Sequence, residues 1–121
     1  MTVTSLPARA GNLLVGGYGP AHAAKEALTR SLSAELSPHG IRVVGVRPHG
    51  IPETQTMRDV YDLKGGGLSW EQFQGYLAST THPKRVMTLA EVANVAAFMA
   101  SDAASGMTGT IVNLTMGSLD D

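Results

Sequence analysis

Residues 20–46 read PAHAAKEALTRSLSAELSPHGIRVVGV, and this stretch decides the fold. Its first part holds good helix formers from Pro20 to Leu36, and proline suits the first turn of a helix because no hydrogen bond needs its missing N–H there. Pro38 and Gly40 predict the end of the helix, since proline cannot continue it and glycine accepts a left-handed turn. The sequence therefore predicts one long helix at this place.

This helix carries one narrow stripe of small and apolar residues, at Ala21, Ala24, Leu28 and Leu32. Such spacing is typical of an amphipathic helix. Residues 41–46 follow, and their β-branched, nearly continuous apolar character predicts a strand that is covered on both faces, as in a parallel sheet. Pro48 ends this strand.

The segment before the helix is rich in glycine, with Gly11, Gly16, Gly17 and Gly19 around the short apolar insert at 13–15. This composition predicts a loop. The sequence before it leaves room for a further strand at the N-terminus.

Residues 50–84 form the least regular segment, because Pro52, a run of three glycines and Pro83 interrupt it. One short amphipathic helix is indicated within it by side chains at spacings of three and four: Trp70, Phe73, Tyr76 and Leu77. A long loop with its own small helix often covers a binding site.

A second long helix is predicted at about 89–100, where Thr88 and Glu91 form a capping box in front of an apolar run. Residues 110–114 then predict a final strand. Alternating helices and strands imply parallel strands joined by right-handed crossovers. The predicted fold class is α/β.

Composition narrows the range of functions. A chain of 121 residues with 43% hydrophobic residues suits one globular domain. Nine basic and ten acidic residues without a run of like charge argue against nucleic acid or membrane as a partner. The absence of cysteine excludes thiolate chemistry, and the four histidines lack ligand spacing, so no metal site is expected. Without an apolar run of about 20 residues or a signal peptide, we expect a cytoplasmic protein.

Three segments in this order resemble the short-chain dehydrogenase/reductase family: the helix at 23–36, GIRV at 40–43 and SDAASGMTG at 101–109. The resemblance runs from about residue 5 to residue 117. It implies the C-terminal half of a doubly wound, Rossmann-like parallel sheet with flanking helices. It also implies NAD or NADP as cofactor and a small carbonyl or alcohol as substrate.

The family's first half, which holds the cofactor pyrophosphate, has no counterpart in the sequence. In such folds a glycine-rich turn after the first strand and the N-terminus of a helix bind the phosphates. The glycines at 11–19 follow no substantial strand, so we do not interpret them as that turn. Residues 1–121 are therefore expected to form a single half-domain without a complete dinucleotide-binding half.

The family's catalytic pair is a tyrosine and, one helical turn later, a lysine whose ammonium stabilises the phenolate. Lys25 matches that lysine, but Ala21 stands at the tyrosine position. Tyr18, one turn further back, and His22, beside that position, are the candidate substitutes. Ser5 is the candidate for the family's active-site serine, although the family's usual spacing from the tyrosine position would place that serine at Ala8.

The resemblance implies that the nicotinamide binds beside the segment after the strand at 41–46. There the family carries Pro-Gly, then Ile or Val, then Thr. The candidate cofactor-binding residues are Lys25, Pro48, His49, Gly50, Ile51 and Thr54. His49 stands at the family's glycine position, and Glu53 stands where threonine is usual unless a shift by one residue brings Thr54 into place.

Two functions remain open. The first is an NAD(P)-dependent oxidoreductase of the short-chain type, catalytically impaired or truncated relative to the family. The second is a non-catalytic protein that acts through homo-oligomeric assembly, because the segments that match the family's subunit interfaces, 23–36 and 89–114, are the apolar ones. A homodimer or a higher homo-oligomer is expected in either case.

Overall fold

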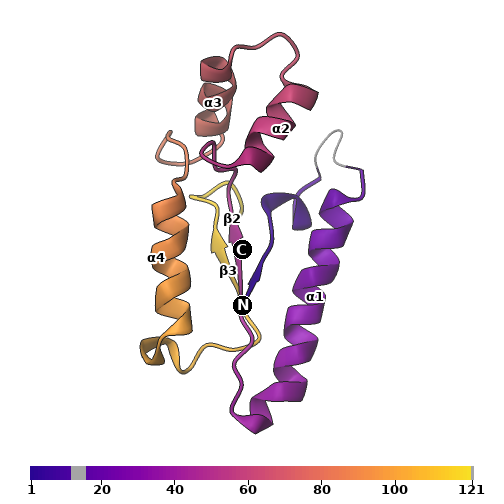
Figure 1. Cartoon of the computed structure of the whole chain (residues 1–121), viewed down its shortest axis with the longest axis vertical. Coiled ribbons are helices and arrows are strands. Elements are labelled where there is room, and N and C mark those ends of the chain that lie inside the picture. The colour runs from indigo at the N-terminus through magenta and orange to yellow at the C-terminus, as the bar shows by residue number, and fades with distance from the viewer. Residues whose placement is uncertain (12–15, 121) are drawn as a thin grey trace.

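The computed structural model describes residues 1–11 and 16–120, and its centre is a sheet of three parallel strands (Figure 1). The strands are β1 (Thr2–Val3), β2 (Gly45–Pro48) and β3 (Ile111–Leu114), with β2 in the middle. Gly45 pairs with Thr2 on one side and with Ile111 on the other. The predicted N-terminal strand and the α/β class are confirmed.

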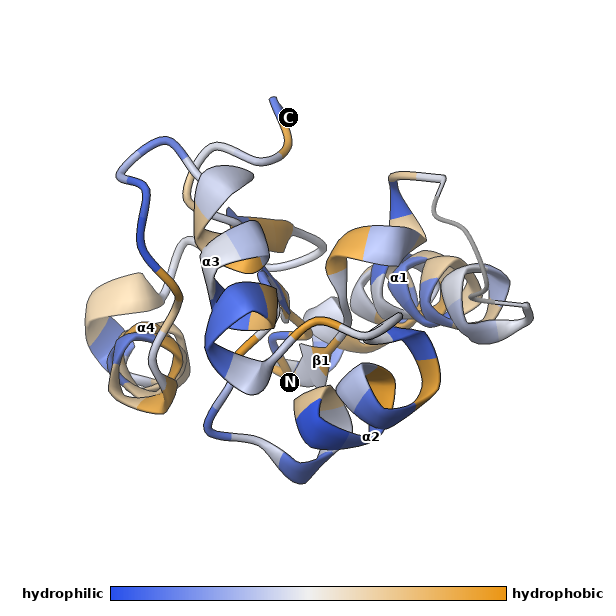
Figure 2. Cartoon of the chain, turned by 90° about the horizontal axis from the view of Figure 1, so that it is seen from above, coloured by the Kyte–Doolittle hydropathy of each residue, from blue (hydrophilic) through white to orange (hydrophobic). Residues whose placement is uncertain are grey.

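Two long helices cover opposite faces of this sheet, as Figures 1 and 2 show from two directions. They are α1 (Tyr18–Leu36), which continues into the 3₁₀ turn η2 (Ser37–His39), and α4 (Leu89–Ala100), which leads to η3 (Asp102–Ala104). Gly40 follows η2 as its C-cap with a φ of 78°, in the left-handed region that glycine adopts without strain. The predicted bounds of both helices are confirmed to within two residues.

A hairpin of two helices lies beyond the carboxyl ends of the strands, at the top of Figure 1. It consists of α2 (Gln55–Lys64) and α3 (Trp70–Ser79). The prediction of one short helix was incomplete, because it missed α2, although Met57, Val60 and Tyr61 recur there at spacings of three and four. The outer side of α2 is hydrophilic (Figure 2). Tertiary packing helps to hold it: the Tyr61 ring meets Trp70 and Phe73 of α3 at centroid distances of 5.2 and 5.4 Å.

The apolar core lies between β2 and α4. Val44, Val46 and Met99 are buried there, and Val92, Val95, Met107, Val112 and Leu114 pack around them. Alternate residues of a strand point to opposite faces, so the neighbouring residues Gly45 and Arg47 face α1 instead. The paired part of the strand is later than predicted, at 45–48 rather than 41–46, but its residues are buried on both faces as expected.

The face of α1 that packs on the sheet is polar, which its sequence does not indicate. The buried residues of α1 are Gly19, Glu26, Thr29 and Ser33. Of the predicted apolar stripe, Ala21, Ala24 and Leu28 are exposed and Leu32 is half-buried. The amphipathic pattern is therefore inverted, with small and apolar residues outside. The apolar insert at 13–15 of the predicted glycine loop lies outside the described residues.

Candidate active site

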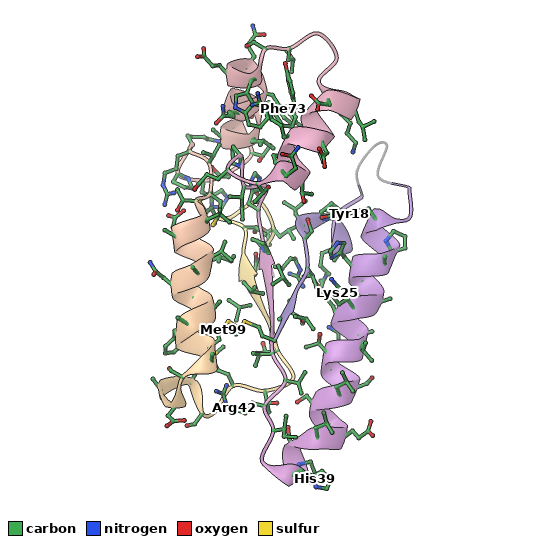
Figure 3. All side chains as sticks on the ribbon, in the orientation of Figure 1. Tyr18, Lys25, His39, Arg42, Phe73 and Met99 are labelled. Atoms are coloured by element: carbon green, nitrogen blue, oxygen red, sulfur yellow. The ribbon has the colours of Figure 1, made fainter. Side chains whose placement is uncertain are left out.

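Lys25 lies on α1 at the carboxyl end of β1, where its ammonium Nζ donates a hydrogen bond of 3.1 Å to the carbonyl oxygen of Val3 (Figure 3). The backbone carbonyl of Lys25 accepts a hydrogen bond of 2.8 Å from the Thr29 hydroxyl one turn later. The Lys25 side chain is exposed, and an ammonium has three N–H donors. Its position leaves it able to bind a ligand at this edge of the sheet.

Tyr18 is the first residue of α1, seven residues before Lys25. Seven residues make almost two turns of an α-helix, so both side chains start from the same side of the helix. The tyrosine is 42% exposed, and its ring lies 4.3 Å from the His22 ring between centroids. Ala21, at the family's tyrosine position, is exposed and has no functional group.

His22 lies between these two residues on the same helix. Burial lowers the pKa of His22, the positive charge of Lys25 lowers it further, and the negative charge of Glu26 acts in the opposite direction. The imidazole is therefore neutral at pH 7. Its Nδ1 atom is buried and has no hydrogen-bond partner among the described residues.

Ser5 follows β1 directly and begins the 3₁₀ turn η1 (Leu6–Ala8). Its carbonyl accepts a hydrogen bond from Ala8 N at 2.9 Å, whereas its side chain makes no capping hydrogen bond with η1 among the described residues. The turn packs on the start of α1 so closely that a Cβ at Gly19 would lie 2.7 Å from the carbonyl oxygen of Pro7. Ser5 therefore shares the carboxyl end of β1 with Lys25, while Ala8 lies within the turn.

Pro48, His49 and Gly50 form the carboxyl end of β2. His49 extends the ladder by donating its backbone N–H to Leu114 O at 3.1 Å, and its side chain is 5% exposed. Its Nε2 lies 2.8 Å from Thr80 Oγ1, at the end of α3. Because the Thr80 hydroxyl already donates to Leu77 O, it accepts from an Nε2–H of His49. Burial lowers the pKa of His49, and the nearby Gly50 carbonyl opposes this effect.

Ile51 and Thr54 connect β2 to the helical hairpin. The Thr54 hydroxyl donates a hydrogen bond of 2.7 Å to the carbonyl oxygen of the buried Ile51. The same hydroxyl accepts from Met57 N at 3.2 Å as the N-cap of α2. The Thr54 side chain is thus engaged in capping. Glu53, one residue earlier, accepts a hydrogen bond from Leu89 N at 3.0 Å and links this segment to the start of α4.

The structure brings most candidate residues to one edge of the sheet. Lys25 and Ser5 lie at the end of β1, the segment 48–51 lies at the end of β2, and the hairpin of α2 and α3 lies beyond them. In open α/β sheets, ligands bind in the crevice outside the carboxyl ends of the strands. The sequence missed two neighbouring residues, Glu26 and Arg47, because neither a lone glutamate in a helix nor a lone arginine in a strand signals burial.

The described residues fit one end of a dinucleotide better than the other. At the ribose end, the exposed Lys25 ammonium is a donor at the carboxyl edge of the sheet. The helix that has glycines before it, α1, follows η1 rather than a strand, so the phosphate-binding arrangement of such folds is not formed at this place. Among residues 1–11 and 16–120, no three acidic or histidine side chains gather as metal ligands.

None of the helices in the described part of the chain is both long and apolar enough to cross a bilayer.

Comparison with known proteins gives consistent matches. A family model described as enoyl-(acyl carrier protein) reductase matches residues 1–118. Galactitol 2-dehydrogenase of Rhizobium johnstonii is 43% identical over 100 residues, which cover 83% of this chain and 36% of the relative. The NADH-dependent enoyl-[acyl-carrier-protein] reductase FabI of Synechocystis is 36% identical over 99 residues, which cover 82% of this chain and 35% of the relative.

A solved structure agrees with these matches. The short-chain dehydrogenase/reductase of Brucella melitensis, described as a glucose/ribitol dehydrogenase, superposes with a TM-score of 0.81 at 32% identity. The superposition covers 98% of this chain and 44% of the other. The chain thus spans less than half the length of each of these three proteins.

Proposed function

Because this chain belongs to the short-chain dehydrogenase/reductase family, we propose that it provides the catalytic helix and the nicotinamide end of an NAD(P)-dependent oxidoreductase site. The observation that carries this proposal is the position of Lys25. Its ammonium is held at the carboxyl end of β1, on the same side of α1 as Tyr18. Residues 1–121 act as one unit in this proposal.

The nicotinamide, when bound, supplies or accepts the hydride. On this chain, Lys25 binds the ribose end of the cofactor and places a positive charge near the reacting oxygen. Tyr18 donates its hydroxyl proton to the oxygen on which negative charge develops. The neutral His22 holds the tyrosine ring in place through the ring contact of 4.3 Å.

We expect the carbon of the substrate that exchanges the hydride to be bonded to an oxygen or conjugated to a carbonyl group. A carbonyl or alcohol carbon fits the sugar alcohol dehydrogenases among the relatives, and an enoyl thioester fits the description of the family model. Both reactions place negative charge on an oxygen, which the same tyrosine and lysine stabilise. We place the reaction in the cytoplasm.

The test is a comparison of Tyr18→Phe, Lys25→Met and Ala21→Tyr in NAD(P)H oxidation with carbonyl and enoyl thioester substrates. We expect Tyr18→Phe to lower kcat by about 10² to 10⁴-fold, the usual contribution of general acid catalysis. Ala21→Tyr should not raise the rate. An unchanged rate in Tyr18→Phe, or a gain in Ala21→Tyr, shows that Tyr18 is not the proton donor.

A second function is favoured by the inverted pattern of α1. Its outer face exposes Ala21, Ala24 and Leu28, of which Leu28 is 54% exposed, while its inner face is polar. An apolar helix face of this kind suits a second copy of the chain. In this proposal the protein acts through assembly without catalysis.

Oligomeric state and cofactor binding separate the two functions. Leu28→Glu should convert a dimer to a monomer in sedimentation velocity, with Arg30→Glu on the same helix as the control for added charge. Titration with NADH and NADPH, followed by nicotinamide fluorescence, then decides whether the chain binds cofactor. Assembly without any such binding supports the non-catalytic function.

A further inference from the structure

Glu26, the residue after Lys25, is buried in an ion pair between α1 and the sheet. Its Oε1 accepts hydrogen bonds from Arg47 Nε at 2.7 Å and from the Thr4 hydroxyl at 2.8 Å, and its Oε2 accepts from Arg47 Nη2 at 2.9 Å. All three residues are at most 3% exposed. The contact therefore joins α1 to both β2 and the end of β1.

Two further polar contacts follow on the same face of the helix. The Thr29 hydroxyl lies 2.8 Å from the Thr2 hydroxyl of β1, and Ser33 Oγ lies 2.6 Å from Thr108 Oγ1 before β3. Thr29 already donates to the Lys25 carbonyl, so Thr2 is the donor in the first contact. Hydrogen bonds depend on distance and angle, whereas apolar contacts tolerate sliding.

Stability alone does not explain a buried ion pair. Removing two charges from water costs several kcal/mol per ion, and a pair of apolar side chains of similar volume is often as stable or more stable. What the pair adds is a defined geometry. The two hydrogen bonds from Arg47 and the third from Thr4 can all be formed in only one position of the Glu26 carboxylate. Burial alone would raise the pKa of Glu26, but the hydrogen bonds from Arg47 and Thr4 outweigh it and lower the pKa, so the carboxylate is charged at pH 7.

We propose that Glu26 and Arg47, together with Thr4, are positioning residues that set the rotation of α1 and thereby hold the Lys25 ammonium on the Val3 carbonyl. A small rotation of α1 displaces the side chains on its surface by a large distance. Side chains reach about 5–6 Å from a helix axis, so a rotation of about 20° moves an atom there by about 2 Å. A displacement of about 1 Å at a reacting centre can lower a rate about 10²-fold.

Thr4 connects the Glu26–Arg47 ion pair to the residue that binds the Lys25 ammonium. Its backbone N–H donates to Val46 O at 2.9 Å, and its side chain holds Glu26, while the preceding residue, Val3, accepts the hydrogen bond from Lys25. Lys25 and Glu26 thus contact consecutive residues of the chain that leaves β1. The use of Lys25 in catalysis rests on the proposed function, but its position does not.

The test measures the reactivity of Lys25 without any need for activity. Trace acetylation of the full chain, with mass spectrometry, gives the rate at Lys25 relative to Lys64 and Lys84, the two other lysines. In Glu26→Met/Arg47→Met, which keeps side-chain volume, we expect an unchanged or higher urea midpoint and a relative rate at Lys25 that rises at least about twofold, as a hydrogen bond is lost. Thr4→Val should give a smaller rise, and Thr4→Ser should remain at the wild-type rate.

Ser33→Ala is the matched control, because it removes a polar contact of α1 two turns further along. An equal rise at Lys25 in this variant overturns the proposal, since the cause is then general loosening of the helix. The same holds if Lys25 reacts at the wild-type rate in both Thr4→Val and the double variant when folded. If the double variant does not fold, Thr4→Val against Thr4→Ser decides.

The activity assay gives a separate answer. If the wild-type chain reduces a substrate, the double variant should lower kcat far more than it raises KM, because it displaces Lys25 without touching the bound substrate. If the chain has no activity, the acetylation rates still decide the positioning role. Failure of the proposed function and failure of this inference are thus distinguishable.

Discussion

The imidazole Nε2 of His49 lies 2.8 Å from the Thr80 hydroxyl, which joins the end of the central strand to the end of α3 across 31 residues of sequence. Glycine is usual at this position in the family that the sequence resembles, where the cofactor comes close. In this chain the larger side chain is accommodated because the hairpin of α2 and α3 covers it. His49 therefore belongs to the attachment of the hairpin more than to an open binding surface.

The stability of the chain should depend on the protonation of His49. Its folded-state pKa lies below the ordinary value of 6.5, since burial disfavours the charged ring. Above pH 6.5 the His49 ring is neutral in both the folded and the unfolded chain, so its titration does not change the stability. Below pH 6.5 the ring binds a proton more readily in the unfolded chain than in the folded one, which lowers the stability of the fold. We expect the urea midpoint to fall as the pH decreases from 6.5, and His49→Asn to weaken this dependence.

The measurement is made in a chain that carries His22→Gln, because the pKa of His22 is also lowered and its titration would add to that of His49. The carboxyls of Glu26 and Glu91 have pKa values below 4.5 and do not titrate in this window. An identical pH dependence in His22→Gln and His22→Gln/His49→Asn would show that His49 is not the responsible group.

The capping box of α4 should be measurable on its own. Thr88 Oγ1 accepts from Glu91 N at 3.2 Å, and Thr88 N donates to Glu91 Oε2 at 2.9 Å. Thr88→Ala removes the first of these contacts, so we expect the free energy of unfolding in urea to fall by about 1 kcal/mol. Thr88→Ser keeps the hydroxyl and should stay close to the wild type.

The core between β2 and α4 should be sensitive to lost volume. Met99 has no exposed surface and packs in one buried cluster with Val46 of β2 and with Val44, which directly precedes that strand. Met99→Ala should lower the free energy of unfolding by about 2–5 kcal/mol, since it loses buried surface and leaves a cavity. Met99→Leu conserves volume and should cost less than about 1.5 kcal/mol, which a parallel denaturation series checks.

The loop after β3 has a position that only glycine fits. Gly117 has a φ of +87°, and a Cβ there would overlap the His82 ring. Gly117→Ala should destabilise the chain by about 1–3 kcal/mol through backbone strain, in addition to the collision. His82→Ala in the same chain should restore part of the loss, and a double-mutant cycle measures that part. Purely additive effects would mean that the ring moves away freely.

Local signals predicted much of the fold. The capping box at Thr88 and Glu91 and the breakers Pro38 and Gly40 act within a few residues, so the sequence alone reveals them. The first long helix and the order of helices and strands along the chain could be predicted from signals of this kind. The beginning of β2 at Gly45 depends on pairing with distant segments, and propensity at 41–44 does not reveal it.

The site was predictable only as far as the family motif extends. Lys25 was found from its place in that motif, and the structure puts it at the end of β1. The roles of Glu26 and Arg47 were not predictable, because their contact joins residues 21 positions apart and burial of each depends on the other. The same reason explains why the apolar stripe of α1 proved to be on the outside.

The two faces of the sheet differ in what holds their helices, and this difference decides how each face can change as the sequence diverges. The seam built on Val44, Val46 and Met99 accepts apolar replacements of similar volume one residue at a time, since such exchanges in a core cost little. On the other face, replacing Glu26 or Arg47 alone removes the opposite charge that the buried partner depends on, so these two residues must change together. The candidate active-site lysine lies on the helix of this second face, beside a residue that cannot be exchanged singly.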